Sequence, residues 1–166
     1  MMAKHDSVAD KLEALGYTLP LPEPKKYDPV VISGNLAFVS GHGPRAADGT
    51  IACTGQLGID VTLDEGYAAA RLVAVNCLAS LKHAIGSLDD VARIVKVLGF
   101  VASGPSFTRQ PEVMHGFSDL LIEVFGPRGR HARSAIGTNV LPGNQSVEVE
   151  MIVELKTQRI ESEAKR

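Results

Sequence analysis

The stretch HARSAIGTNVLPGNQSVEVEMIVEL, residues 131–155, decides the fold that this sequence predicts. It contains two candidate strands, and the first covers roughly 133–140 with small and β-branched residues. Between them, residues 141–144 read Leu-Pro-Gly-Asn, in which proline fixes φ while glycine and asparagine tolerate positive φ. We therefore predict a terminal β-hairpin whose two strands are partners.

The second strand alternates between apolar and mostly acidic side chains, as expected for a strand with one buried face. In the predicted hairpin, an arginine at the start of one strand and a carboxylate inside the other can share one site. Arg133 can hold a planar carboxylate through two parallel hydrogen bonds, and Glu148 can orient or deprotonate a water molecule. The apolar face is Val147, Val149, Met151 and Val153, and the other face is Glu148, Glu150, Ile152 and Glu154.

Composition favours one soluble globular domain. A chain of 166 residues is long enough for a sizeable core, and 45% hydrophobic with 22% charged residues is ordinary for this class. The formal net charge of -2 offers no global basic field, so composition does not favour nucleic acid as a partner. No signal peptide is visible, and no apolar run approaches the roughly 20 residues of a membrane span. We expect a cytoplasmic protein with reduced thiols and no membrane partner.

The N-terminal part predicts a short helix followed by a connector. Ser7 and Asp10 resemble a capping box, and Gly16 can end the helix. The segment LPLPEPKKYDP, residues 19–29, has four prolines and predicts an extended path on the surface. We divide the chain into an N-terminal helix and proline-rich extension (1–26), a core domain (27–156) and a charged tail (157–166).

The core domain predicts an α+β fold, with two helices packed on one face of a mixed sheet. Thr62 and Glu65 form a second capping box, at the start of the longest helix. Cys77 lies in the apolar pattern of that helix, so we interpret it as a core residue. The predicted elements are strands at 30–32, 36–40, near 51–54 and 91–102, a helix from 62 to about 85, a helix from Pro111 to Gly126, and the terminal hairpin.

The sequence resembles the YjgF/RidA family, also known as L-PSP endoribonuclease or translation inhibitor. The resemblance is carried by Arg133-Ser134, Leu141-Pro142 and Val147-Glu148-Val149-Glu150, extends back to Phe38-Val39-Ser40-Gly41, and spans roughly Tyr27 to Leu155. It implies the chorismate-mutase-like fold, assembled as a homotrimer with sites in the clefts between subunits. The N-terminal helix and connector look like the extension of a longer branch of the family.

The resemblance also implies site residues. Arg133 matches the carboxylate-binding arginine, and Glu148 matches the residue that orients water. His42 replaces a glutamine of the family pattern, and Ala135 stands where the deaminase branch often has a cysteine, which argues against thiol-dependent regulation. Tyr27, Ser40 and Gly41 match a substrate pocket, together with Arg133. His115, which stands where the family often has an asparagine, is a further candidate for substrate binding.

The implied activity is hydrolysis of reactive enamine or imine intermediates, of the 2-aminoacrylate type, to a 2-oxo acid and ammonia. The histidines show no metal-ligand spacing and Ser40 and Ser134 lack a triad context, so we expect no metal, no cofactor and no covalent nucleophile. A non-catalytic trimer that binds a small carboxylate is the alternative, because the same arginine serves both functions. RNA cleavage is the third hypothesis, with local support limited to the basic segment PRGRHAR, residues 127–133.

Overall fold

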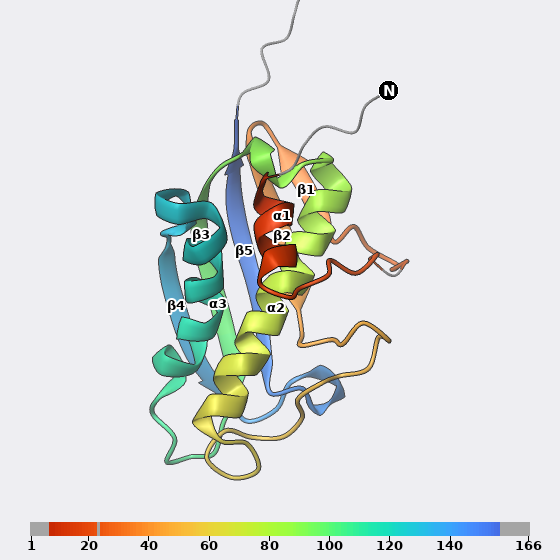
Figure 1. Ribbon diagram of the computed structural model, residues 1–166. Coiled ribbons are helices and arrows are strands. Elements are labelled where there is room, and N and C mark those ends of the chain that lie inside the picture. The colour runs from red at the N-terminus through yellow and green to blue at the C-terminus, as the bar shows by residue number, and fades with distance from the viewer. Residues whose placement is uncertain (1–6, 23, 157–166) are drawn as a thin grey trace, which may run out of the picture.

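The protein is an α+β fold in which three helices lie on one side of a five-stranded mixed sheet (Figure 1). This computed structural model describes residues 7–22 and 24–156, so the predicted tail at 157–166 lies outside the described residues. The strands are β1 (Val30–Ser33), β2 (Leu36–His42), β3 (Val91–Ala102), β4 (Ala132–Thr138) and β5 (Val147–Leu155). The helices are α1 (Ser7–Ala14), α2 (Leu63–Ile85) and α3 (Gln110–Phe125), with 3-10 turns η1 (Leu88–Asp90), η2 (Gly126–Gly129) and η3 (Pro142–Asn144).

The predicted terminal hairpin is wrong, although both of its strands exist. The sheet order is β1-β2-β5-β3-β4, so β3 lies between the two strands that we expected to pair. β4 runs parallel to β3, and β5 runs antiparallel to both β2 and β3. The alternation of β5 correctly identified its buried face, where Val147, Val149 and Val153 are fully buried. Alternation specifies a buried face and not a neighbour, which is why the partner was misassigned.

Two further expectations are corrected. The segment at 51–54 forms no strand; it makes isolated bridges, from Arg45 to Ile51 and from Thr54 to Gln145. The predicted N-terminal helix is confirmed as α1, but it buries Val8 and Leu12 in the common core, so three helices instead of two share that core. The N-terminal helix is therefore packed as part of this fold.

Helix α2 follows the sequence prediction closely and forms the centre of the core. Thr62 accepts a hydrogen bond from the backbone N–H of Glu65, whose carboxylate accepts one from the backbone N–H of Thr62, which completes the capping box. The Cys77 thiol contacts the carbonyl of Val149, so α2 packs across β5. By length and composition α2 could span a membrane, contrary to our expectation, but it is mostly buried inside the fold, as a core helix is.

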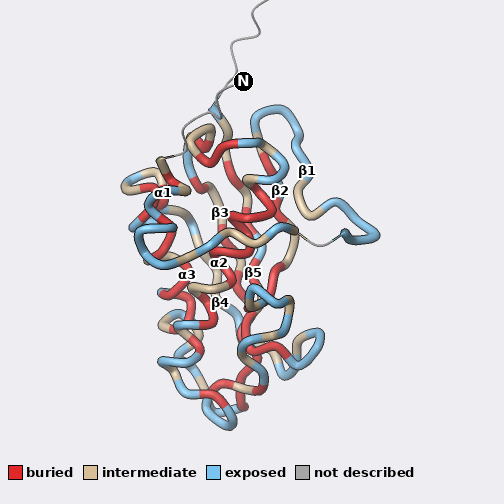
Figure 2. Tube along the Cα trace, turned by 45° about the vertical axis from the view of Figure 1, so that its right-hand side comes forward, coloured by how far each residue is buried: buried red, intermediate tan, exposed pale blue. Residues whose placement is uncertain are grey.

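Burial is concentrated between the helices and the sheet, and the loops are exposed (Figure 2). The opposite face of the sheet carries no described helix, yet it exposes large apolar side chains from three strands. Val31, Phe38 and Ile136 are 52%, 43% and 48% exposed. An apolar sheet face of this kind is typical of an interaction surface.

Candidate functional site

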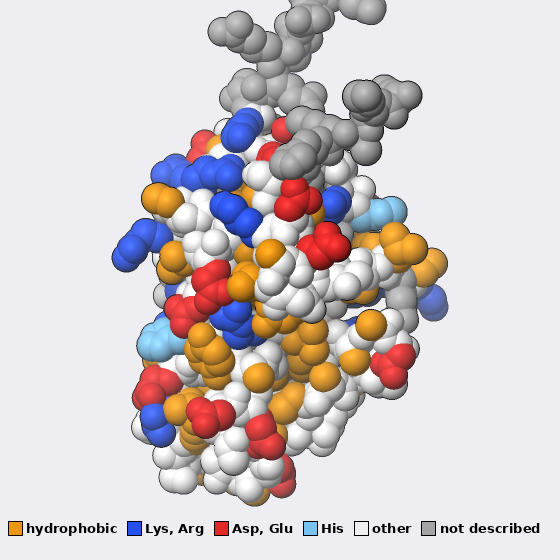
Figure 3. Space-filling view, viewed as in Figure 1, with side chains coloured by type: hydrophobic (Ala, Val, Ile, Leu, Met, Phe, Trp, Pro, Cys, Tyr) orange, Lys and Arg blue, Asp and Glu red, His pale blue; other side chains and the backbone are white. Residues whose placement is uncertain are grey.

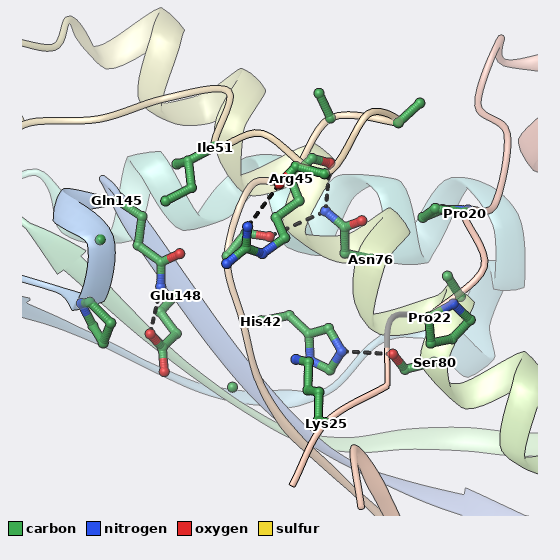
Figure 4. Close-up of a pocket in the computed structure, with 18 of the residues that line it drawn as sticks. Pro20, Pro22, Lys25, His42, Arg45, Ile51, Asn76, Ser80, Gln145 and Glu148 are labelled. Carbon is green, nitrogen blue, oxygen red and sulfur yellow. Dashed lines mark hydrogen bonds between the residues drawn. The ribbon is translucent and has the colours of Figure 1, made fainter. Parts of the chain in front are cut away.

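A cavity of about 450 Å³ opens between the end of β2, the first half of β5, helix α2 and the proline-rich connector (Figure 4). Three of the predicted site residues line it: Tyr27, Gly41 and Glu148. Arg133, Ser40 and His115 do not. Other lining residues that matter below are Lys25, His42, Arg45, Asn76, Ser80 and Gln145.

A β-bulge in β2 shapes this cavity. Val39 pairs with Met151 and His42 pairs with Val149, so three steps along β2 match two steps along β5. The extra residue reverses the alternation of side chains, and His42 therefore points to the helix side, where it is 8% exposed. Without the bulge, position 41 would face the helices instead.

Glu148 is held at the wall of the cavity. One carboxylate oxygen, Oε2, accepts a hydrogen bond of 2.6 Å from the side-chain amide of the buried Gln145. The other, Oε1, lies against Gly41, where any side chain would collide with it. Gly41 thus allows the backbone of β2 to approach the carboxylate closely, which is a physical reason for glycine at this position.

His42 bridges β2 and α2. Its Nδ1–H donates to the carbonyl of Ser40 at 2.6 Å, and the Ser80 hydroxyl donates to its Nε2 at 2.8 Å. Burial, reinforced by the nearby charge of Lys25, lowers the pKa of His42 below its ordinary value of 6.5. The ring is therefore neutral at pH 7, and because a carbonyl can only accept, the proton sits on Nδ1.

Cationic groups complete the cavity wall. The ammonium of Lys25 donates to the Tyr27 hydroxyl at 3.2 Å, and the guanidinium of Arg45 donates to the carbonyl of Gly49 at 2.8 Å. The side-chain amide of Asn76 donates to the carbonyls of Gly43 and Arg45, so it fixes the loop that follows the bulge. We call Glu148, Gln145, His42 and Ser80 the cavity cluster.

Arg133 lies in a second group of polar side chains, at the β4 edge of the sheet. Its guanidinium donates to the Ser118 hydroxyl at 2.9 Å and to the carbonyl of Pro111 at 3.1 Å. The Ser118 hydroxyl in turn donates to Nε2 of His131 at 3.0 Å, while Nδ1 of His131 donates to the carbonyl of Gly129 at 2.7 Å. We call Arg133, Ser118 and His131 the edge cluster.

Charges in the edge cluster leave Arg133 suited to an anionic ligand. Its two acceptors are neutral oxygen atoms, and Asp119, whose charge favours the guanidinium, instead accepts the hydroxyl of Tyr67 at 2.8 Å. Burial, together with the charge of Arg133, lowers the pKa of His131, so this histidine is neutral as well. His115 is exposed on α3. It lies four residues after Pro111 and three before Ser118, the two residues of α3 that Arg133 contacts, so helical spacing puts His115 on the same side of the helix.

One copy of the chain does not bring Arg133 and Glu148 together, which corrects the shared site that the hairpin predicted. Arg133 pairs with the buried Val97 and so points toward the helices, whereas Glu148 pairs with Phe100 and leaves the sheet on the other face. Ser40 lies in the bulge, and its hydroxyl is buried without a hydrogen-bond partner among the described residues.

The polar residues that α2 presents to the cavity were not among the predicted site residues. Asn76 and Ser80 are four residues apart in an apolar, alanine-rich helix, and this spacing puts both on one face. Both are nearly buried, which is uncommon for polar residues and could have served as a signal. Across 7–22 and 24–156, no three histidine, cysteine or acidic side chains gather as metal ligands would.

The fold and the bulged, glycine-lined cavity define an α+β protein of chorismate-mutase-like architecture. The chain belongs to the family described as "YjgF/chorismate mutase-like, putative endoribonuclease", whose model matches residues 10–155. The match begins inside α1 and ends at the last residue of β5, so it covers nearly the whole described fold. The resemblance found in the sequence is confirmed.

One curated protein and two solved structures illustrate what the chain is similar to. Protein TCP17 of Trypanosoma cruzi is 45% identical over 151 residues, which are 89% of this chain and 94% of that protein. The crystal structure of Atu1372 from Agrobacterium tumefaciens, a protein of unknown function, is 45% identical with a TM-score of 0.85, covering 91% of this chain and 93% of that one. The crystal structure of a protein described as "a putative endoribonuclease" from Shewanella oneidensis MR-1 is 36% identical, also with a TM-score of 0.85. The match covers 90% of this chain and 100% of that one.

Proposed function

We propose that this protein is a cytoplasmic enamine/imine deaminase that hydrolyses 2-aminoacrylate-type intermediates to a 2-oxo acid and ammonia. The observation that carries the proposal is the position of Glu148, a carboxylate held by an amide at the wall of a cavity. The Gln145 amide holds one oxygen of the carboxylate in place at the cavity wall, where the carboxylate can orient a water molecule. The two free cysteines suit a reducing compartment.

The chemistry needs no group beyond these residues and water. The enamine tautomerises to an imine, and protonation of the imine nitrogen makes the adjacent carbon electrophilic. Water adds to that carbon while Glu148 takes the water proton, and Glu148 then passes this proton to the nitrogen. Ammonia leaves as the C–N bond breaks, and the proton of the new hydroxyl group returns to Glu148 as the carbonyl forms. The carbonyl that remains is the 2-oxo acid.

Because one copy separates Arg133 from Glu148, we propose that a second copy supplies the arginine in a homotrimer. The uncovered apolar sheet face supports this assembly, since burying it between copies removes Val31, Phe38 and Ile136 from water. Arg133 would then clamp the substrate carboxylate with two charge-assisted hydrogen bonds across the subunit boundary. A monomer mass by light scattering at micromolar concentration would remove this model.

Ammonia release from enzymatically generated 2-iminopropanoate tests the function. Wild-type protein should release ammonia faster than buffer, and co-expressed Arg133→Lys and Glu148→Gln chains should test the shared site. Mixed trimers contain some clefts with an intact arginine from one chain and an intact glutamate from the other, so part of the activity should return. Failure to restore activity would mean that the two residues do not meet across subunits.

The alternative is a trimer that binds small carboxylates without catalysis, and the same experiment separates it. Wild-type protein that binds a 2-oxo acid in calorimetry yet releases no ammonia above buffer would establish this binding function. RNA cleavage has weaker support, because the basic segment is partly occupied within the fold. Arg128 donates to the carbonyl of Val91 and stacks on Phe125, and Arg133 is engaged by α3. On the face in Figure 3, acidic and basic side chains are interspersed.

A further inference from the structure

We propose that Ser80 and His42 form a nucleophile–base pair that accepts acyl groups from small carboxylic esters within the cavity, independently of Arg133. Ser80 lies within hydrogen-bond reach of His42, and His42 is oriented by a third group, the carbonyl of Ser40. This order of nucleophile, base and orienting group is the arrangement that activates a serine hydroxyl.

The protonation state of His42 is the one that a general base needs. Because the carbonyl of Ser40 accepts the proton on Nδ1 of His42, Nε2 carries a free lone pair. This lone pair faces the Ser80 hydroxyl, and 2.8 Å separates Nε2 from the hydroxyl oxygen. Since burial keeps the pKa of His42 below its ordinary value, the base is available at neutral pH. The bulge that turns His42 toward α2 is therefore what creates the pair.

The cavity around Ser80 and His42 can admit an ester and its acyl group. Ser80 and His42 both line the cavity, so a ligand can reach them although each is nearly buried (Figure 4). Asn76 lies one turn before Ser80, but its two N–H groups are already donated to backbone carbonyls. Lys25 is the cation close enough to affect the charge of His42, and it is the group that would stabilise an oxyanion.

The step balances without a further reagent. The Ser80 oxygen attacks the ester carbonyl carbon as its proton passes to Nε2 of His42. The tetrahedral intermediate collapses, the bond to the alcohol oxygen breaks, and the alcohol leaves with that proton. Water, deprotonated by His42, then attacks the acyl-Ser80 and releases a carboxylic acid, which regenerates the serine hydroxyl.

Acetylation by p-nitrophenyl acetate tests the pair in the full-length protein. We expect a burst of p-nitrophenol and one acetyl group on Ser80, located by peptide mass spectrometry. Ser118 is the internal comparison, because its hydroxyl makes the same contact with a histidine but does not line the cavity. Ser80→Ala and His42→Gln should slow the burst at least about 100-fold, the scale for losing a nucleophile or its base.

Ser103→Ala is the matched control, because this buried serine donates its hydroxyl to the carbonyl of Val101 and lies outside the cavity lining. It should keep the wild-type burst. Thermal unfolding of each variant establishes that it folds, and His42→Gln retains a group that can hydrogen-bond Ser80. Acetyl on Lys25 or Ser118 instead of Ser80, an unchanged burst in Ser80→Ala, or no acetylation in wild type would each overturn the proposal.

Discussion

The cavity cluster and the edge cluster contain the same local unit in two settings. In each, a histidine donates Nδ1–H to the carbonyl two residues before it and accepts a helix serine hydroxyl at Nε2. His42 lines a cavity with a carboxylate, whereas His131 sits beside Arg133 at the sheet edge. The difference lies in the surroundings, which decide whether such a unit faces a ligand or positions a neighbouring side chain.

The two clusters also divide the proposed chemistry between them. Glu148 offers a base without a carboxylate anchor, and Arg133 offers an anchor without a base. Neither cluster is a complete deaminase site alone, so the proposed activity requires that two copies of the chain meet. A variant of Glu148 therefore tests the base, and a variant of Arg133 tests the carboxylate anchor.

The largest effect is expected for Glu148→Gln. Glutamine keeps the shape of the side chain but cannot take a proton from water, so imine hydrolysis should slow by about 100-fold or more. Binding of a 2-oxo acid should stay nearly unchanged, because the proposed carboxylate anchor is Arg133. Ammonia release and calorimetry measure the two properties separately.

Glu13→Gln is the control, since Glu13 is exposed on α1, away from the apolar sheet face and outside the cavity lining. It should hydrolyse imine at the wild-type rate. A wild-type rate for Glu148→Gln would instead remove the base from the cavity cluster.

Arg133→Lys should have the next largest effect. Lysine keeps the charge but loses the two-pronged geometry, and a charged hydrogen bond contributes about 1.5–3 kcal/mol, so 2-oxo acid affinity should fall roughly 10-fold to 100-fold. Arg130→Lys, at an exposed position in the same segment, should bind normally in the same calorimetric measurement. Normal binding by Arg133→Lys would place the carboxylate anchor elsewhere.

Most of the fold could be predicted from the sequence, because each main element has a local signal. Helix α2 has a capping box and an apolar stripe, α3 has an apolar stripe, β3 is a long β-branched run, and β5 alternates. Strand partners could not, since β4 and β5 are neighbours in sequence but are separated by β3 in the sheet. Glu148, Gly41 and Tyr27 were placed in one pocket only through the family resemblance. The bulge depends on pairing between distant strands, so no local pattern predicts that His42 turns toward Ser80.

The two histidines should make stability depend on pH. Burial lowers the pKa of both His42 and His131, and nearby positive groups, Lys25 and Arg133, act in the same direction. The unfolded chain then binds more protons below about pH 6.5, so the free energy of unfolding falls as pH drops through 6.5. The slope is at most about 1.4 kcal/mol per pH unit for each histidine.

Urea unfolding between pH 7 and pH 5 measures this slope, above the range where the carboxylates with lowered pKa, such as Glu112 and Glu123, begin to titrate. His42→Gln should flatten it more than His131→Gln, because His42 is the more buried of the two. If both variants flattened the pH dependence of the unfolding free energy equally, burial in the cavity would not lower the pKa of His42 more than that of His131 is lowered.

The smallest effect is expected for RNA, which tests whether the edge cluster faces nucleic acid instead of a partner copy. Phosphate contacts would make affinity fall steeply with salt, in proportion to the number of contacts. The segment 127–133 offers three arginines, and two of them are engaged with Val91, Phe125, Pro111 and Ser118. We therefore expect no measurable binding of an RNA oligomer at about 150 mM salt by fluorescence anisotropy. Tight binding that weakens steeply as salt rises would assign the edge cluster to RNA and leave Glu148 without its carboxylate anchor.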